Sequence, residues 1–475
     1  MILLIILTIF LLTAISISIG MVLAKKEDKE GDDGMCYNAT VEVSTQNTHL
    51  PPRDGMLISS IAFGSCFKPN LQSDHQLWKH FRAHFNASHS LWNWLGDNMY
   101  ADSNRMNDKR TAYNAARDDT FYAAYGPVAE PKIPTTGTWD DHDYGWNNVG
   151  NNYACPDLSQ AEFVHHFGIP ESDPRHPAQG QNQRKGVYSA YMFARPQTDN
   201  HASTSTSLLQ INKTNSTDNT NNNYGIHLIN LDARSHRSPT FSEYGTCQHE
   251  NSTMLGDIQW AWLEQELLTR TSEIKILASG TQVLPPLHRK TRNLEAYCAY
   301  DGPGQSFDQS IASIGEDDAD QFEGTEYESW AELPQERAKL LRLVQRSIHR
   351  GMAKQILFIS GDQHWAEITV KTIPATDNLM AVTVLEVTAS GIDQNWPHDI
   401  DNTNRMQVDQ TYHGVVTMET AERDENTCTD NRFHVCRAQA NYGGIRVDWE
   451  RNQIELAIYT PHATEVVAAR VTLDF

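Results

Sequence analysis

Short apolar runs alternate with segments of helical periodicity through most of the chain. Buried strands are predicted where such a run is continuous, at residues 58–63, 90–95, 226–231, 274–278 and 355–359. Between these runs, apolar residues recur at helical spacing. The predicted helices are one carrying Leu77, Phe81 and Phe85, one over 111–125, one capped by Asp257, and one that begins at Pro334 and ends at Gly351. No strand is apparent before Trp139.

The alternation of strands and helices predicts an α/β fold. After Val382 the pattern becomes a series of short β segments, which suggests a second sheet packed on the first. With 475 residues, 39% of them hydrophobic, the chain is long enough for one large domain with a sizeable core.

We expect this domain over residues 41–475, after a flexible charged leader at 25–40. Two polar segments interrupt its pattern and carry no motif. They are an insert rich in Thr, Ser and Asn at 197–223 and an acidic loop at 301–329.

Residues 1–24 carry no charged side chain and are followed by Lys25 and Lys26. This pattern is typical of a secretory signal peptide. It also fits a retained membrane anchor, because about 20 apolar residues span a bilayer. Sequons for N-glycosylation at Asn38, Asn86, Asn212, Asn215 and Asn251 favour export and N-glycans. We therefore expect a chain that is secreted or lies at the extracellular face of the membrane.

The chain has seven cysteines, and an exported chain with an odd number has one unpaired thiol. Cys66, at the end of a predicted strand, is the candidate for that thiol. The other six would form three disulfides, of which Cys428–Cys436 is the pairing that we predict. The formal net charge of −22 argues against a nucleic-acid-binding surface, which needs clustered Lys and Arg.

Four segments place metal-binding side chains directly after apolar runs, at 61–66, 94–100, 139–148 and 359–367. Side chains that follow neighbouring strands of an α/β sheet converge at one edge of that sheet. A packed core has no use for carboxylates and imidazoles at those points, whereas a metal ion does. The candidate ligands are Cys66, Asp97, Tyr100, Asp140 or Asp141, Asn147 or Asn148, Asp362 and His364.

The donor types indicate two kinds of metal ion. Free tyrosine titrates near about 10, so a phenolate from Tyr100 at neutral pH needs a strongly acidic, trivalent ion. Cys66 would add a thiolate to the same ion. An amide oxygen from Asn147 or Asn148 suits a harder divalent ion such as calcium. Asp362 and His364 are two residues apart, which permits one ligand for each metal.

Two further residues are candidates for the chemistry. His142 could donate a proton to a leaving group or bind the phosphate of a substrate. Arg234 follows a buried strand and could clamp phosphate oxygens or pair with Asp232. The sequence contains no Walker glycine loop, no Gly-X-Ser-X-Gly and no His-Glu-X-X-His.

Together these segments resemble the alkaline phosphatase D (PhoD-like) family of metallophosphatases. The matching segments occur in family order, at 63–66, 95–100, 139–145, 231–234, 259–263, 279–282, 360–364 and 386–391. The resemblance implies a calcineurin-like αββα sandwich, in which helices flank two mixed β-sheets and a metal cluster lies at one edge.

The resemblance also implies hydrolysis of phosphate monoesters and diesters with iron(III) and calcium. Cys66, Asp97, Tyr100 and His364 would bind iron(III), and Asp97 would bridge the two ions. Asp140 or Asp141, Asn147 and Asp362 would bind calcium. A metal-bound hydroxide would attack phosphorus in line, without a phosphoenzyme intermediate.

Two alternatives remain open at this stage. One is a non-catalytic extracellular binding protein that calcium stabilises on the same fold. The other is a phosphodiesterase or phospholipase that acts at a membrane surface, which a retained anchor at 1–24 would favour.

Overall fold

The computed structural model describes residues 35–40, 42–43, 48–69, 75–195, 224–240, 251–284, 328–394, 417–420, 435–437, 440–461 and 469–475. The signal or anchor segment, the insert at 197–223 and most of the leader and of the acidic loop lie outside these residues. Within the described ranges, no helix combines the length and the apolar character that crossing a membrane requires.

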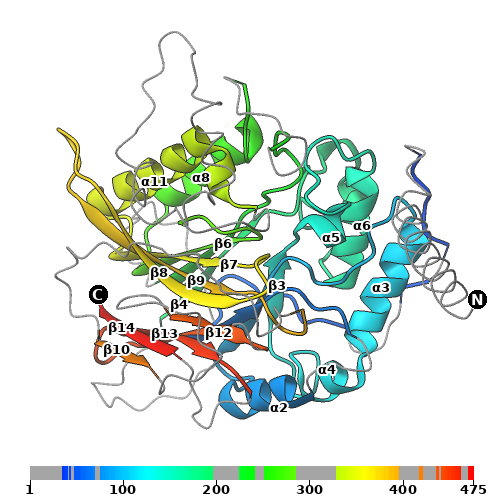
Figure 1. Cartoon of the computed structure of the whole chain (residues 1–475), viewed down its shortest axis with the longest axis horizontal. Coiled ribbons are helices and arrows are strands. Elements are labelled where there is room, and N and C mark those ends of the chain that lie inside the picture. The colour runs from blue at the N-terminus through cyan, green and yellow to red at the C-terminus, as the bar shows by residue number, and fades with distance from the viewer. Residues whose placement is uncertain are drawn as a thin grey trace, which may run out of the picture.

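Two seven-stranded sheets stack face to face and helices cover their outer faces, which confirms the αββα sandwich (Figure 1). The first sheet has the order β10 (Thr417–Thr420), β14 (Ala469–Asp474), β13 (Gln453–Tyr459), β12 (Tyr442–Asp448), β1 (Ser60–Gly64), β2 (Ser90–Leu95), β3 (Thr135–Thr138). The second has the order β11 (Val435–Arg437), β8 (Ala366–Ile373), β9 (Val382–Ala389), β7 (Gln355–Ser360), β6 (Ile274–Ser279), β5 (Tyr224–Asn230), β4 (Ser189–Ala194).

Both sheets are mixed. Strands β1, β2 and β3 run parallel in the first sheet, as do β5, β6, β7 and β9 in the second. The other strand pairs are antiparallel. The parallel strands thus occupy one end of the first sheet and the middle of the second, and their carboxyl ends lie at one edge of the sandwich.

Three hydrophobic clusters hold the layers together. Side chains such as Phe63 and Leu228 fill the space between the two sheets. A cluster rich in aromatic residues packs helices α2 (His75–His84), α3 (Met106–Asp118), α4 (Thr120–Tyr125) and α6 (Pro156–His166) against the first sheet. A third cluster packs helices α8 (Gly256–Thr269) and α11 (Pro334–His349) against the second sheet.

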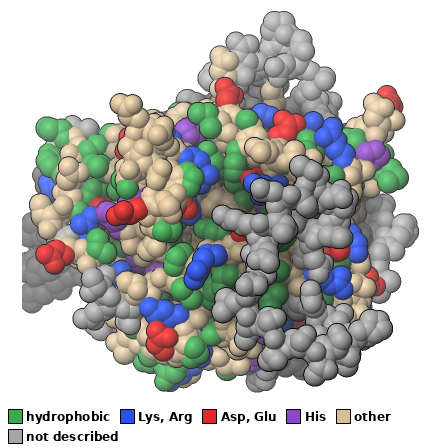
Figure 2. Space-filling view, turned by 180° about the vertical axis from the view of Figure 1, so that it is seen from behind, with side chains coloured by type: hydrophobic (Ala, Val, Ile, Leu, Met, Phe, Trp, Pro, Cys, Tyr) green, Lys and Arg blue, Asp and Glu red, His purple; other side chains and the backbone are tan. Residues whose placement is uncertain are grey.

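The outer surface is mixed in character. On the face opposite to the view of Figure 1, hydrophobic, basic and acidic side chains are interspersed over the described residues (Figure 2).

The five predicted buried strands are confirmed as β1, β2, β5, β6 and β7. Strand β3 has the sequence Thr-Thr-Gly-Thr and was not predicted, because no apolar side chain marks it although all four residues are buried. The predicted second sheet packed on the first is confirmed, but the tail does not form it by itself. Its strands instead extend both sheets, and β12 pairs antiparallel with β1.

Two helix boundaries also differ from expectation. The predicted helix over 111–125 is two helices, α3 and α4, and the side chain of Asp119 caps α4 by accepting the backbone N–H groups of Phe121 and Tyr122. Asp257 lies in the first turn of α8, where a carboxylate favours the helix dipole, and Leu255 is the residue at the cap.

A disulfide joins Cys36 to Cys155, the residue that precedes α6. Cys66 is buried and unpaired, as expected. The predicted Cys428–Cys436 pairing is untested, because Cys428 lies outside the described residues.

Helix α8 offers a direct test of the packing on the second sheet. Leu263 is fully buried in the third cluster, whereas Ile258 on the same helix is 74% exposed. Leu263→Ala is expected to lower the free energy of unfolding by about 2–5 kcal/mol in urea denaturation, because it removes apolar contacts and leaves a cavity. Ile258→Ala is the control, with an expected change of about 0.5 kcal/mol or less. Equal changes in the two variants would contradict this packing.

Candidate metal centre

The candidate ligands lie where the parallel strands of both sheets end. Cys66, Asp97, Asp140 and Asp362 follow the last residues of β1, β2, β3 and β7 by two positions each. This spacing is the same because each strand leaves its sheet at the same edge. The carboxyl ends of the strands thus bring distant parts of the sequence together.

Hydrogen bonds join the edges of the two sheets at this point. The hydroxyl of Thr138 donates to the Leu231 carbonyl at 2.6 Å, and the indole N–H of Trp139 donates to Asp232 at 2.8 Å. Gly96 and Gly280 flank Asp140 so closely that a Cβ on either would lie 2.3 Å or 2.5 Å from its side chain. Any larger residue at these glycines would displace the Asp140 carboxylate.

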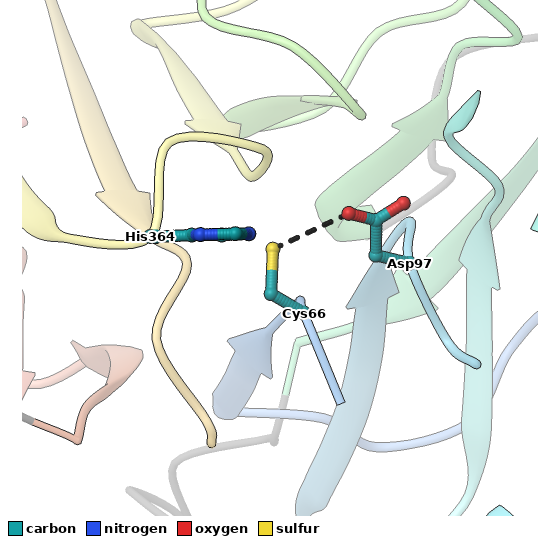
Figure 3. Close-up of side chains that lie close together, drawn as sticks. All are labelled: Cys66, Asp97 and His364. Atoms are coloured by element: carbon teal, nitrogen blue, oxygen red, sulfur yellow. Dashed lines mark hydrogen bonds between the residues drawn. The ribbon is translucent and has the colours of Figure 1, made fainter. Parts of the chain in front are cut away.

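The first cluster contains Cys66, Asp97, Tyr100 and His364. The Cys66 thiol lies 3.5 Å from Asp97 Oδ2, and the Tyr100 hydroxyl lies 3.0 Å from the same oxygen. The Tyr100 hydroxyl is also 3.2 Å from His364 Nε2. Figure 3 shows the thiol, the carboxylate and the imidazole pointing toward one another from three separate segments. Their ligand atoms lie within 4.8 Å of one another, a distance that one metal ion can span.

The second cluster contains Asp140, Asp141 and Asp362. One carboxylate oxygen from each lies within 4.8 Å of the others. Asp141 also approaches Asp97 and His142 to the same limit, so the two clusters adjoin. Asp140 Oδ2 is buried without a hydrogen-bond partner among the described residues, which is costly for a carboxylate unless a cation satisfies it.

The first cluster opposes the ionisation that metal binding requires. Burial raises the pKa of the Asp97 carboxyl well above its ordinary value, and the nearby charge of Asp141 adds to this. Burial likewise raises the pKa of the Cys66 thiol and of the Tyr100 hydroxyl, and Asp97 raises both further. A cation at the centre of these groups would lower the pKa of each, because it stabilises the anionic form.

The second cluster has the same electrostatic character. Removal from water, with the charges of Asp140 and Asp141, raises the pKa of Asp362 well above its ordinary value. Burial raises the pKa of Asp140 to about 7 against the opposing effect of Arg234. Burial also opposes ionisation of Asp141, but His142 and Arg234 outweigh it and lower that pKa. The donor sets of both clusters fit metal ions.

The backbone is strained at the same positions. Among the described residues, seven that are not glycine have a positive φ. Six lie in or beside the two clusters, namely Cys66, Asp97, Asp102, Asn148, Asp362 and His364. Residues other than glycine rarely adopt this conformation, and it persists only where the surroundings enforce it. The fold therefore holds the ligand segments in unfavourable conformations that aim their side chains at one point.

His142 lies beside both clusters on the short helix α5 (Asp141–Tyr144). Its Nδ1 is 2.7 Å from Asp102 Oδ1, and its ring packs against Tyr100 at 4.2 Å between centroids. Burial opposes a charged imidazole, but Asp141, Asp97 and Asp102 outweigh it and raise the pKa of His142 to about 10. The side chain of His142 is 15% exposed, so it is partly accessible to solvent.

The side chain of Arg234 does not pair with Asp232, which was one of the two contacts expected for it. It is completely buried, its Nε donates to Asp140 Oδ1 at 2.5 Å, and its Nη1 is 2.5 Å from Glu328. Only its backbone N–H reaches Asp232. Because no part of the guanidinium is open to solvent, the structure favours a role in positioning Asp140 over contact with a substrate.

Asn147 is exposed, and none of the hydrogen bonds of the described residues joins its side chain to the second cluster. The neighbouring Asn148 donates its backbone N–H to Asp141 Oδ2 at 2.6 Å. Sequence analysis missed Asp102, which pairs with His142, and also Glu328, which pairs with Arg234 and Arg237 beside the second cluster. The charge of Asp102 next to the Asp97–Tyr100 segment is a signal that could have indicated it, whereas Glu328 lies at the end of a segment without a motif.

Comparison with known proteins agrees with this architecture. The family model of the PhoD-like phosphatase matches residues 61–455. The chain therefore belongs to the PhoD-like phosphatase family, and this family relationship implies phosphoesterase activity.

The fold is also similar to a solved structure of PhoD, with a TM-score of 0.51 and 16% sequence identity. The similarity covers 86% of this chain and 67% of that one. No curated protein sequence matches the chain.

The electrostatics of the second cluster predict that the effect of Asp362→Asn on stability changes sign when metal binds. In protein stripped of metal by a chelator, Asp362→Asn is expected to raise the midpoint of urea unfolding at neutral pH. The substitution removes a carboxylate whose pKa is raised by its removal from water and by repulsion from Asp140 and Asp141. With calcium present the same substitution is expected to lower the midpoint, because it removes a ligand.

Asp173→Asn is the matched control. Asp173 accepts two hydrogen bonds from the Arg175 guanidinium, and neither residue belongs to the clusters. Its effect is expected to be destabilising and independent of metal. If Asp362→Asn destabilised the stripped and the loaded protein equally, the account of repulsion would be contradicted.

Proposed function

We propose that the chain is an exported, metal-dependent phosphoesterase that hydrolyses phosphate monoesters, phosphate diesters or both. The observation that carries this proposal is the convergence of Cys66, Asp97, Tyr100 and His364 beside three further carboxylates. The thiol, phenol and imidazole of the first cluster suit iron(III). The second cluster offers only carboxylate oxygens, which suit calcium.

In this proposal Asp97 would supply a ligand to both ions, because its carboxylate faces both the Cys66–His364 side and the Asp141 side. Asp140, Asp141 and Asp362 would hold the calcium ion. An amide from Asn147 stays a prediction, and it requires this exposed residue to turn inward. Bound cations would neutralise phosphoryl oxygens and make water acidic enough to act as the nucleophile.

The residues of the chain supply the remaining chemistry. Water attacks phosphorus on the side opposite the leaving oxygen, so the ester P–O bond breaks as the new P–O bond forms, without a covalent link to the protein. His142 donates a proton to the leaving oxygen, and Asp102 holds its Nδ1 so that Nε2 faces the substrate. The exposed Lys68, whose Nζ lies 5.3 Å from the centroid of the Tyr100 ring, attracts the phosphate anion.

The His142–Asp102 pair favours an enzyme over a binding protein of the same fold. A protein that only bound calcium would need no imidazole held by a carboxylate beside its metal ligands. The family relationship supports the same conclusion.

Two observations support export. The Cys36–Cys155 disulfide is typical of proteins in oxidising compartments. The asparagines of the three sequons within the described residues, Asn38, Asn86 and Asn251, are exposed and thus accessible to glycosylation. Cleavage of residues 1–24 and their retention as an anchor are both compatible with this proposal.

The proposal predicts that single ligands of the first cluster are indispensable. Cys66→Ser and Asp97→Ala should each reduce hydrolysis of an aryl phosphate monoester and of the matching diester to the uncatalysed rate. Circular dichroism should show that both variants remain folded. The Asp173→Asn variant should keep its activity, since its side chain lies outside the clusters. Unchanged turnover in both cluster variants would rule out this site.

A second prediction concerns the proton donor. A general acid must be protonated, so activity should fall as the pH rises through the pKa of His142. Asp102 is one of the groups that raise this pKa. Asp102→Asn should lower it and move the alkaline limb of the kcat profile to lower pH. His142→Asn should abolish that limb together with most of the rate. An alkaline limb at the same pH in Asp102→Asn would contradict this role.

A further inference from the structure

Glu328 lies beside the second cluster although no motif marks it. Its side chain is 3% exposed, and it lies two residues before the short helix η3 (Trp330–Glu332). Two buried arginines converge on this carboxylate, with Arg234 Nη1 at 2.5 Å from Oε2 and Arg237 Nη1 against Oε1. A buried carboxylate that binds two arginines is a strongly constrained point in a protein interior.

The first arginine connects Glu328 to Asp140. Arg234 Nε donates to Asp140 Oδ1 at 2.5 Å, while its Nη1 lies against Glu328. The guanidinium is therefore shared between two carboxylates, and it contacts Asp140 through Oδ1 alone. Asp140 Oδ2 has no hydrogen-bond partner among the described residues and remains available to a cation.

The second arginine connects Glu328 to Asp141. Arg237 Nη2 donates to the backbone carbonyl of Asn148, and the backbone N–H of Asn148 donates to Asp141 Oδ2 at 2.6 Å. Asn148 has a φ of 60°, a conformation that needs support from its surroundings. The Glu328–Arg237 pair supplies that support.

The backbone of Glu328 reaches the third carboxylate. Gln363 Nε2 donates to the Glu328 carbonyl at 2.8 Å and to Asp362 Oδ2 at 2.7 Å. Glu328 is thus connected to Asp140, Asp141 and Asp362 by three separate paths.

Charge supports the same conclusion. Glu328 places a negative charge between Arg234 and Arg237, next to Asp140 and Asp141. Without this charge the two arginines would be drawn toward Asp140 and Asp141, and the site would attract a cation less strongly.

We propose that Glu328 is a positioning residue that sets the geometry and charge of the Asp140–Asp141–Asp362 cluster and thereby its affinity for a divalent cation. This inference rests on the proposed second metal site. Glu328 touches neither the substrate nor the reacting atoms. It acts through Arg234, Arg237 and Gln363.

The test is calcium binding to the full chain, measured by equilibrium dialysis and elemental analysis without any assay of activity. Glu328→Gln keeps the shape of the side chain and removes its charge. It is expected to weaken calcium binding by about 10- to 100-fold, as loss of a residue that orients metal ligands does. The metal content of the Cys66–His364 cluster should stay at the wild-type level. Glu328→Asp, which keeps the charge, should recover part of the calcium affinity.

Glu336→Gln is the matched control. Glu336 is a buried carboxylate that accepts hydrogen bonds from Trp260 and Thr253 on the same side of the second sheet. Its substitution should leave calcium binding unchanged, even where it lowers stability.

The outcomes separate the two proposals. Calcium binding in Glu328→Gln equal to that of the wild type would overturn the role of Glu328 and leave the second metal site intact. Equal loss of both metals in Glu328→Gln and in Glu328→Asp would show a general structural role and also overturn it. A wild-type chain that binds no calcium at all would instead refute the proposed function.

Discussion

Carboxylates held close together away from water are the constraint on which the rest of this structure depends. Asp97, Asp140 and Asp141 are buried at the edge where the two sheets meet, and Asp362 lies against them. Burial and mutual repulsion oppose their ionisation, as the raised pKa of Asp97 and of Asp362 shows. Two arginines offset this charge only in part. The site is therefore suited to bind cations. The residues around it hold the carboxylates in place against their mutual repulsion.

The sandwich provides the rigidity that this balance requires. Parallel strands from both sheets end at the same edge, so four ligand segments start two residues beyond fixed, buried strands. Positive φ angles at Cys66, Asp97, Asp362 and His364 then turn those segments toward a common centre. Such conformations are tolerated because the hydrophobic clusters on both sides of each sheet hold the strand ends. Packing energy in the layers thus stabilises an arrangement at the edge that is locally unfavourable.

The central strands and the first cluster could be predicted from the sequence, because a buried parallel strand is a continuous apolar run and its ligand follows directly. Strand β3 escaped prediction, since it has no apolar side chain and is held by its neighbours. Arg234 and Glu328 show a different limit. Local sequence could not reveal that Arg234 would be shared by Asp140 and Glu328, because this contact joins segments about 90 residues apart. The destination of the tail strands depended in the same way on pairing that no local pattern encodes.

The most direct test of the central claim is a crystal structure of the purified chain with anomalous diffraction recorded on both sides of the iron absorption edge. We predict an iron peak within bonding distance of Cys66, Asp97, Tyr100 and His364. A second cation, without an iron signal, should lie among Asp140, Asp141 and Asp362. Electron density that showed these side chains closed on one another, with no ion at either position after growth in iron and calcium, would contradict the claim.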